Sequence, residues 1–553
     1  MKKIISIVCT MLLAASTAIA QPSAVQKAGK SVFTLTTFKA DNSILASTHG
    51  VFTGTDGEAV SSWTPFVGAA RAVVIDADGQ QHNVEAIYGT NELYDVCRFR
   101  VDGKTQSASL AKSNANVGNK LWLVGYSVKK PQCKTFTVKN AETFGEQSYG
   151  YYIFNEQAAE NMADCPFVNQ NGEIVGLLQH SKNNNETHAT DARFINAFRT
   201  RGLSINDPVM RQTSIRVALP EDINDARLML MIAGEKNDST SYAGYIADFI
   251  RMFPTAIDGY SARAQRALAT ADYPTADATM QAAIINVTSK DEAHSAYSSI
   301  IYQKEAYMQD STYPSWTLQK AFDEANAAYN IKPEPVYQHQ MAQVNYAMGN
   351  YQQAYQQFIE LTKSNIRNGE LFYEAAQCHT QLGGTTDEVL ALLDSAVNVN
   401  PENSITAPYY LARGRMLDQA GEYRKAVADY NKYDTLMLGR GSHEFYYIKF
   451  KAESRIRQYQ QALNDIAHAI ILNRREPTYY AEMASLQLRV NQLEEAIHTA
   501  DLCIALEPEY ADPYIVKGIA QGELKQKNEA LETLTKAKEL GDKRAQELIE
   551  KYK

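Results

Sequence analysis

The stretch YYAEMASLQLRVNQLEEAIHTADLCIALEP, residues 479–508, decides the fold of the second half of this 553-residue chain. Its small and apolar residues recur at the spacing of amphipathic helices, and Ala496 opens the second of two helices. Pro508 follows at the end of the unit, where a proline cannot continue the preceding helix. The stretch therefore predicts a helix-turn-helix unit of roughly 34 residues.

This unit repeats along the chain. The segments YYLARGRMLDQAGEYRKAVADYNKY (409–433) and PYIVKGIAQGELKQKNEALETLTKAKEL (513–540) superimpose on the same template. The residues expected to open the second helix of each unit are Ala276, Ala321, Ala354, Val389, Ala426, Ala462, Ala496 and Ala530. The last three are 34 residues apart, and only the first interval, 45 residues, needs an insertion. We predict about eight repeats over residues 255–553, preceded by junction or capping helices over residues 206–254.

The template strongly resembles the tetratricopeptide repeat (TPR). This resemblance implies a curved superhelix in which small residues such as Gly414 let large ones such as Tyr430 approach closely. Tyr260, Tyr410, Tyr480 and Tyr514 are expected to fill packing positions. By analogy with the family, the groove that binds peptides or partner helices is lined by His339, Gln343, Tyr346, Arg415, Asp418, Tyr447 and Lys451. The alternative is that these are solvated polar residues.

The first twenty residues, MKKIISIVCTMLLAASTAIA, have the pattern of a secretory signal peptide. Lys2 and Lys3 precede a short apolar run, and Ala18 and Ala20 frame a cleavage site after Ala20. The run is too short to span a membrane, and no later segment supplies a transmembrane helix. We expect an exported protein, most simply periplasmic, with release outside the cell as an alternative. A lipoprotein anchored at Cys9 is a weaker alternative.

Charge and motif content exclude several function classes. Loss of the leader, which carries two lysines and no acid, moves the net charge from -9 to -11. A mildly acidic chain without a basic stripe argues against nucleic acid as a partner. There is no CxxC, no HExxH and no Cys/His cluster at metal-ligand spacing. We therefore predict neither a metal site nor a cofactor.

Five cysteines follow the leader. In an oxidising compartment Cys97, Cys133 and Cys165 could supply one disulfide, and Cys133 with Cys165 is the preferred pair. Cys378 and Cys503 lie on helical patterns and are expected to be small buried hydrophobic residues.

Residues 21–205 have a different pattern. Short β-branched and aromatic runs such as SVFTLTTF, RAVVIDAD and KLWLVGY alternate with Gly, Asn and Asp turns, which predicts an all-β domain. Its length suits a sandwich or a pair of barrels.

Two motifs in this half resemble the trypsin-like serine proteases, particularly the periplasmic Deg type. HGVFTGTDGEAVSS (49–62) matches the approach to the catalytic histidine, and NMADCPFVNQNGEIVG (161–176) keeps the frame of the nucleophile loop. The resemblance implies a double barrel. It also places Thr64 where the family has its histidine, keeps the aspartate as Asp95, and puts Ala163 at the nucleophile position.

These exchanges predict the loss of serine-protease chemistry. A methyl group cannot attack a carbonyl, and threonine cannot act as a general base near neutral pH. Asp164 also stands where negative charge would develop. An alternative keeps activity by using Cys165 as a thiol nucleophile, with His49, His180 or His188 as the base.

The predicted fold class is thus an all-β trypsin-like double barrel followed by an all-α TPR superhelix, a solenoid. The predicted function is an exported, non-enzymatic scaffold or adaptor that binds other envelope proteins or peptides. Two alternatives stay open at this point: an active protease that uses Cys165, and an architectural β cap on a TPR scaffold.

Overall fold

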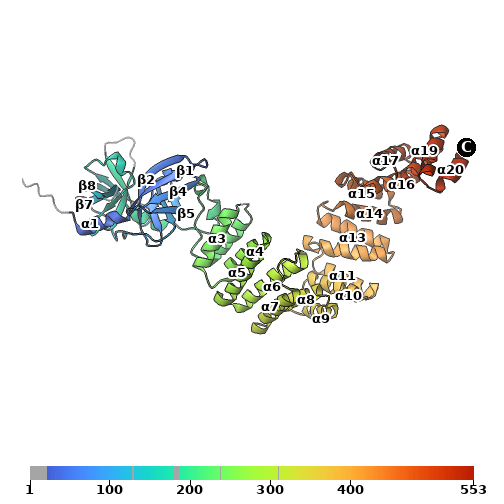
Figure 1. Cartoon of the computed structure of the whole chain (residues 1–553), viewed down its shortest axis with the longest axis horizontal. Helices are drawn as coiled ribbons and strands as arrows, with labels where there is room; N and C mark the ends of the chain where they lie inside the picture. The colour runs from blue at the N-terminus through green and yellow to red at the C-terminus, as the bar shows by residue number, and fades with distance from the viewer. Residues whose placement is uncertain (1–20, 128–129, 180–185, 237, 309) are drawn as a thin grey trace, which may run out of the picture. The chain divides into compact units, whose positions relative to one another are not determined.

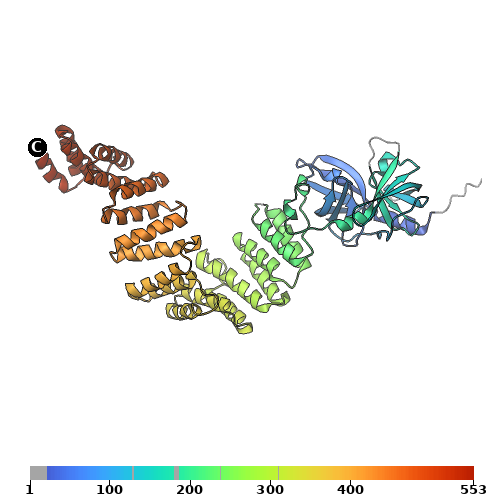
Figure 2. The same cartoon turned by 180° about the vertical axis from the view of Figure 1, so that it is seen from behind.

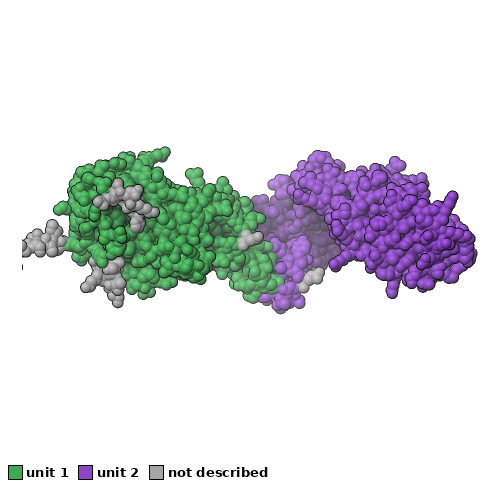
Figure 3. Space-filling model, turned by 90° about the horizontal axis from the view of Figure 1, so that it is seen from above, with its two compact units in different colours: residues 1–289 green, residues 290–553 purple. Residues whose placement is uncertain are grey.

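The computed structural model describes residues 21–127, 130–179, 186–236, 238–308 and 310–553. The predicted signal peptide, residues 1–20, and His180 lie outside the described residues. The chain divides into two compact units, residues 1–289 and 290–553, coloured separately in Figure 3. We describe each unit by itself.

The first unit begins with a short helix, α1 (Ser23–Ala28), and a closed six-stranded antiparallel barrel (Figure 1). The strand order around the barrel is β1-β2-β3-β6-β5-β4. The strands are β1 (Val32–Phe38), β2 (Ile44–Phe52), β3 (Glu58–Ser61), β4 (Arg71–Ile75), β5 (Gln81–Asn91) and β6 (Val96–Val101). The strand residues Phe33, Phe52 and Phe99 share the core of this barrel, because alternate side chains of a strand point to one face, and Phe66 joins them from a 3-10 helix.

A second closed barrel follows, with the strand order β10-β11-β12-β9-β8-β7. Its strands are β7 (Lys120–Ser127), β8 (Lys130–Phe144), β9 (Tyr149–Phe154), β10 (Pro166–Val168), β11 (Ile174–Gln179) and β12 (Thr187–Asp191). Phe136, Phe154 and Phe167 form its aromatic centre, and the last two rings stack 4.2 Å apart. The predicted all-β double barrel, the shape of trypsin-like folds, is confirmed.

Four helices complete the first unit: α2 (Ile223–Gly234), α3 (Ser239–Met252), α4 (Ile257–Ala269) and α5 (Tyr273–Asn286). The segment before them extends the first barrel, because the amide of Ile87 donates to the carbonyl of Arg216 (2.9 Å) and that of Ala218 donates to Ile87 (2.7 Å). Asp248 of α3 forms ion pairs with Arg100 of β6 (2.6 Å) and Arg216 (2.7 Å). These contacts attach the helices to the barrel.

The second unit is all-helical, and successive helices lie side by side in both views (Figures 1 and 2). The helices are α6 (Lys290–Tyr307), α7 (Leu318–Ile331), α8 (Pro335–Ala347), α9 (Tyr351–Leu361), α10 (Gly369–Gln381), α11 (Thr386–Val399), α12 (Ala407–Gln419), α13 (Tyr423–Leu436), α14 (His443–Arg455), α15 (Tyr459–Leu472), α16 (Pro477–Arg489), α17 (Leu493–Leu506), α18 (Asp512–Glu523), α19 (Lys527–Glu539) and α20 (Arg544–Tyr552). Among the helices that the structure describes, none combines the length and apolarity needed to cross a bilayer.

The repeat pattern is confirmed at the level of helix pairs. All eight residues expected to open a second helix lie in the first turn of one, from Ala276 in α5 to Ala530 in α19, and all are buried. Gly414 of α12 leaves room for the Tyr430 ring of α13, since a Cβ at Gly414 would lie 2.7 Å from that ring. The insertion predicted in the first interval joins α6 to α7.

Short 3-10 helices connect the regular elements: Gly29–Ser31, Thr64–Phe66, Glu160–Met162, Ala192–Ala197, Ser204–Asn206, Met210–Gln212 and Ser404–Thr406. Thr64 begins one of them, Thr64–Phe66, and Ala163 directly follows another, Glu160–Met162.

Candidate functional site

Asp95 and Thr64 lie next to each other at the end of the first barrel. The backbone amides of Trp63 and Thr64 donate to Asp95 Oδ1 at 2.8 and 2.7 Å, and the Thr64 hydroxyl donates to the same oxygen at 3.0 Å. Asp95 therefore caps the 3-10 helix Thr64–Phe66, because its carboxylate accepts the amides that begin that helix. The structure brings these two predicted positions together without any imidazole between them.

The loop at Ala163 forms a tight turn. The amide of Met162 donates to Ala159 O (3.0 Å), that of Ala163 to Glu160 O (3.3 Å), and that of Cys165 to Met162 O (3.1 Å). An oxyanion hole needs amides that converge on a point outside the loop. These amides instead satisfy carbonyls within the loop.

Asp164 joins the two barrels. The backbone of Asp164 adopts φ 62°, a left-handed conformation that aspartate tolerates better than most residues. The side chain of Asp164 is buried. The hydroxyls of Thr48 on β2 and Ser62 after β3 both donate to Asp164 Oδ2, the latter at 2.7 Å. The carboxylate thus occupies the seam between the barrels.

His49 contributes to the same seam. Its Nδ1 lies 3.1 Å from Ala163 O, and because a carbonyl only accepts, this nitrogen carries the proton. Burial lowers the pKa of His49 and outweighs the opposing effect of the hydrogen bond to Ala163. The neutral imidazole is therefore favoured near neutral pH.

Thr48 and Ser62 were not singled out in the sequence. Thr48 precedes His49 and Ser62 lies two residues before Thr64, but a hydroxyl residue carries no local signal of its hydrogen-bond partner. Their shared acceptor, Asp164, is more than a hundred residues away in the sequence, so only the closed barrels bring the three together.

Cys165 lies inside the second barrel. Its side chain is fully buried beside Met162 and Phe167, and burial raises the pKa of the thiol far above its usual range. A nucleophilic cysteine needs an accessible thiolate. Of the candidate bases, His49 contacts Ala163 O instead, and His188 lies 3.9 Å from Glu186.

The predicted disulfide is not formed. Cys133 and Cys165 are both free cysteines. Cys133 is half-buried and packs beside Val124, Val168 and their neighbours, whereas Cys165 belongs to a different cluster inside the second barrel. Their separation into two clusters is the physical reason why the pair does not bond.

The predicted groove residues of α8 form an internal network. Glu374 of α10 accepts from Gln343 (2.8 Å) and lies 2.6 Å from Nε2 of His339. Burial alone would disfavour the charged form of His339, but its hydrogen bond to Glu374 and the nearby Glu370 outweigh this and raise its pKa. Tyr346 is half-buried and packs edge-to-face on Tyr351 (5.4 Å). The sequence did not point to Glu374, because its partners lie one repeat earlier.

The predicted groove residues of α12 and α14 are more accessible. Arg415 and Lys451 are exposed, and Asp418 is half-buried. Lys451 lies over the ring of Tyr447 at 4.6 Å, and Tyr447 itself packs against Tyr479. This stretch can therefore offer cationic groups to a ligand.

Within the described ranges, no group of three or more His, Cys, Asp or Glu side chains is placed to hold a metal ion. The chain matches no protein-family model, and no curated protein matches its sequence.

Proposed function

We propose that this chain is an exported, non-enzymatic scaffold that binds proteins or peptides through a groove of TPR-type repeats. In this proposal the double barrel is a trypsin-like fold, most similar to the Deg type, that has lost catalysis. Export rests on the leader pattern of residues 1–20, most simply to a periplasm.

The observation that carries the non-enzymatic part is the loop at Ala163. It offers a methyl group in place of a nucleophile, and its amides donate to carbonyls within the loop. Asp95 accepts three hydrogen bonds from Trp63 and Thr64, so it orients no base. Serine-protease chemistry needs all three parts at once.

The binding part is supported by the helix pairs of the second unit. In each pair the second helix carries the buried anchor of the template. Stacked pairs of this kind form the extended concave surfaces that repeat proteins use for binding. Arg415 and Lys451 occupy equivalent places on α12 and α14, and both side chains are exposed. Such a row can hydrogen-bond an extended partner.

A first experiment tests catalysis. The mature chain is incubated with a denatured protein substrate and with a fluorogenic peptide library. We expect no cleavage above the level of a Cys165→Ala variant. Cleavage that disappears in Cys165→Ala would contradict the proposal and favour the cysteine alternative.

A second experiment tests the groove. Partners captured by the full chain from its own cell envelope are compared with those captured by the double variant Arg415→Glu/Lys451→Glu. The matched control is Arg424→Glu, an exposed arginine of the second helix α13. Loss of a partner in the double variant alone is expected. Equal capture by all three chains would remove Arg415 and Lys451 from the proposed site.

A truncated chain tests the alternative in which the β domain is only an architectural cap on the repeats. If the β half only caps the repeats, then residues 256–553 alone retain every partner. Partners held only by the full chain would exclude this alternative.

A further inference from the structure

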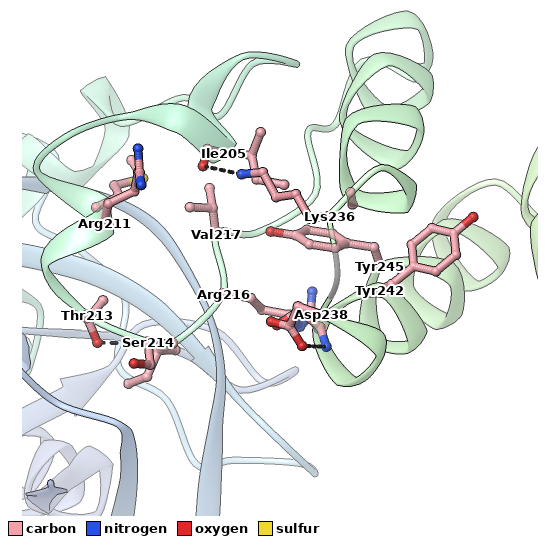
Figure 4. Close-up of a pocket in the computed structure, with 14 residues that line it drawn as sticks. Ile205, Arg211, Thr213, Ser214, Arg216, Val217, Lys236, Asp238, Tyr242 and Tyr245 are labelled. Atoms are coloured by element: carbon pink, nitrogen blue, oxygen red, sulfur yellow. Dashed lines mark hydrogen bonds between the residues drawn. The ribbon is translucent and has the colours of Figure 1, made fainter. Parts of the chain in front are cut away.

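A cavity of about 140 Å³ lies in the first unit, where residues 205–217 meet α2 and α3 (Figure 4). Most of its wall is apolar, formed by Ile205, Met210, Ile215, Val217, Ala233, Tyr242 and Tyr245. Apolar cavities of about 150 Å³ in other proteins hold a benzene molecule. The space is therefore suited to one small ring or a short branched chain.

The rim of this cavity is cationic. Arg211 and Lys236 line it, and no carboxylate among the described residues pairs with either. The Nζ of Lys236 donates to the neutral Asn206 Oδ1 at 3.0 Å and contacts Ile205 O (Figure 4). Neither of these two acceptors of Lys236 carries a charge.

Arg216 adds an unsatisfied donor to the wall. Its Nη2 pairs with Asp248 Oδ2 at 2.7 Å, and its guanidinium lies over the ring of Tyr245. Its Nη1 is buried and, among the described residues, has no hydrogen-bond partner. Asp248 is already shared with Arg100 and Arg251, so one carboxylate serves three arginines. A buried donor without an acceptor is costly, and a ligand anion would relieve that cost.

One acid opposes an anion at this place. Asp238 lines the cavity and caps α3, because its carboxylate accepts from the amide of Ser241 at 3.0 Å. Hydrogen bonds from Ser241 lower the pKa of Asp238, so it is ionised near neutral pH. The charged groups of the wall are thus three cations and one anion.

We propose that this cavity binds a small monocarboxylate whose apolar body is about the size of a benzene ring. The apolar body fills the space beside Val217 and Tyr245, and the carboxylate faces Arg216, whose Nη1 lacks a partner among the described residues, while Arg211 and Lys236 line the rim. The ligand is either a free organic acid or the C-terminal residue of another chain, since both present the same chemistry. This inference does not depend on the proposed function, because it concerns neither the groove nor the loop at Ala163.

The test is calorimetric titration of the mature chain with matched probes. Benzoate carries both features, and benzyl alcohol keeps the ring but lacks the charge. We expect benzyl alcohol to bind at least about tenfold more weakly, because hydrogen bonds to a charged group are the stronger ones. Acetyl-Gly-Gly-Phe with a free carboxylate and its C-terminal amide distinguish the two sources: binding of the free peptide indicates a chain terminus, and binding of benzoate alone indicates a free acid.

Variants then locate the site. Lys236→Gln and Arg211→Gln are expected to weaken benzoate binding, whereas Asp238→Asn should tighten it, because asparagine caps a helix as well as aspartate and removes the opposing charge. Lys363→Gln, an exposed lysine of the second unit, is the control and should change nothing. All are surface changes, so thermal unfolding should stay near that of the parent. Equal affinity for benzoate and benzyl alcohol, no saturable binding up to roughly 10 mM, or no response to these variants would overturn the proposal.

Discussion

At the scale of single residues, the same side chain can serve catalysis or structure depending on its neighbour. The sequence resemblance assigns Asp95 to the place where trypsin-like proteases orient a histidine; in the structure its neighbour is Thr64, and the carboxylate caps a 3-10 helix. Asp164 likewise replaces a glycine of the resembled motif and joins the two barrels through Thr48 and Ser62. Both positions were visible in the sequence, but their hydrogen-bond partners were not.

A prediction at this scale concerns the turn inside each helix pair. Arg457, Asn491 and Lys525 each adopt φ 64° five residues before a second-helix anchor, where Gly421 and Gly349 stand in other pairs. The left-handed conformation costs a residue with a Cβ about 1–2 kcal/mol. Arg457→Gly and Lys525→Gly should therefore each stabilise the chain by about 0.5–1 kcal/mol, measured by urea unfolding. Gly421→Ala is the matched reverse change and should destabilise it; stabilisation by this change would contradict the argument.

At the scale of elements, the helix pairs share a recurrent tyrosine bond. The hydroxyls of Tyr260, Tyr480 and Tyr514 each donate to a carbonyl six residues earlier, at 3.1, 3.2 and 3.0 Å. Tyr446 and Tyr410 make comparable bonds to Gly439 O and Pro401 O. The sequence predicted packing tyrosines at four of these positions. The structure shows in addition that the hydroxyl of each of these tyrosines hydrogen-bonds to the loop that leads into its helix.

One element carries a buried acid. Glu453 of α14 is 1% exposed, and its Oε2 has no hydrogen-bond partner among the described residues. Burial and the neighbouring Asp465 raise the pKa of Glu453 to about 8. The neighbouring cation, Lys449, forms its ion pairs with two other acids, Asp465 at 3.1 Å and Asp434 at 3.3 Å.

This acid predicts a pH dependence. The folded state holds the Glu453 proton more tightly than the unfolded state, whose pKa is near 4.5, so stability falls as pH rises from about 4.5 to about 8. Glu453→Gln should remove this loss and stabilise α14 and α15 at pH 9 by a few kcal/mol, since one pKa unit is worth about 1.4 kcal/mol. The gain at pH 4 should be much smaller. Hydrogen exchange of the α14 and α15 amides at both pH values measures it, and an equal gain at both would refute the explanation.

At the scale of the whole molecule, each compact unit has its own means of cohesion. In the first unit the two barrels meet at Asp164, and the helices are attached to the first barrel by Asp248, which is 6% exposed and contacts Arg100, Arg216 and Arg251. In the second unit each helix contacts its neighbours in the chain.

Removal of Asp248 tests that attachment. Asp248→Asn leaves three arginines without their shared acid and should destabilise the first unit by about 3–5 kcal/mol. Burial opposes ionisation of Asp248, but Arg216 and Arg100 outweigh this and lower its pKa. Its contribution is therefore present above about pH 4 and is lost as pH falls through the folded-state pKa.

Tryptophan fluorescence during guanidinium unfolding measures this effect, because Trp63 and Trp122 belong to the barrels. Asp222→Asn, a change at the exposed N-cap of α2, is the control and should cost little. Equal stability of the parent and Asp248→Asn would show that the ion pairs do not attach the helices.

The sequence by itself determined the two-part organisation and the repeat period with its eight anchors. These are local properties, because helical periodicity and strand alternation can be recognised within a short window of sequence. Only the tertiary structure decided that Glu374 engages His339 and Gln343, that Cys133 and Cys165 lie in separate clusters, and that Asp164 and Asp248 hold the first unit together. Each of these depends on residues brought together from distant strands or neighbouring repeats, and such contacts follow from chain closure and packing rather than from local pattern.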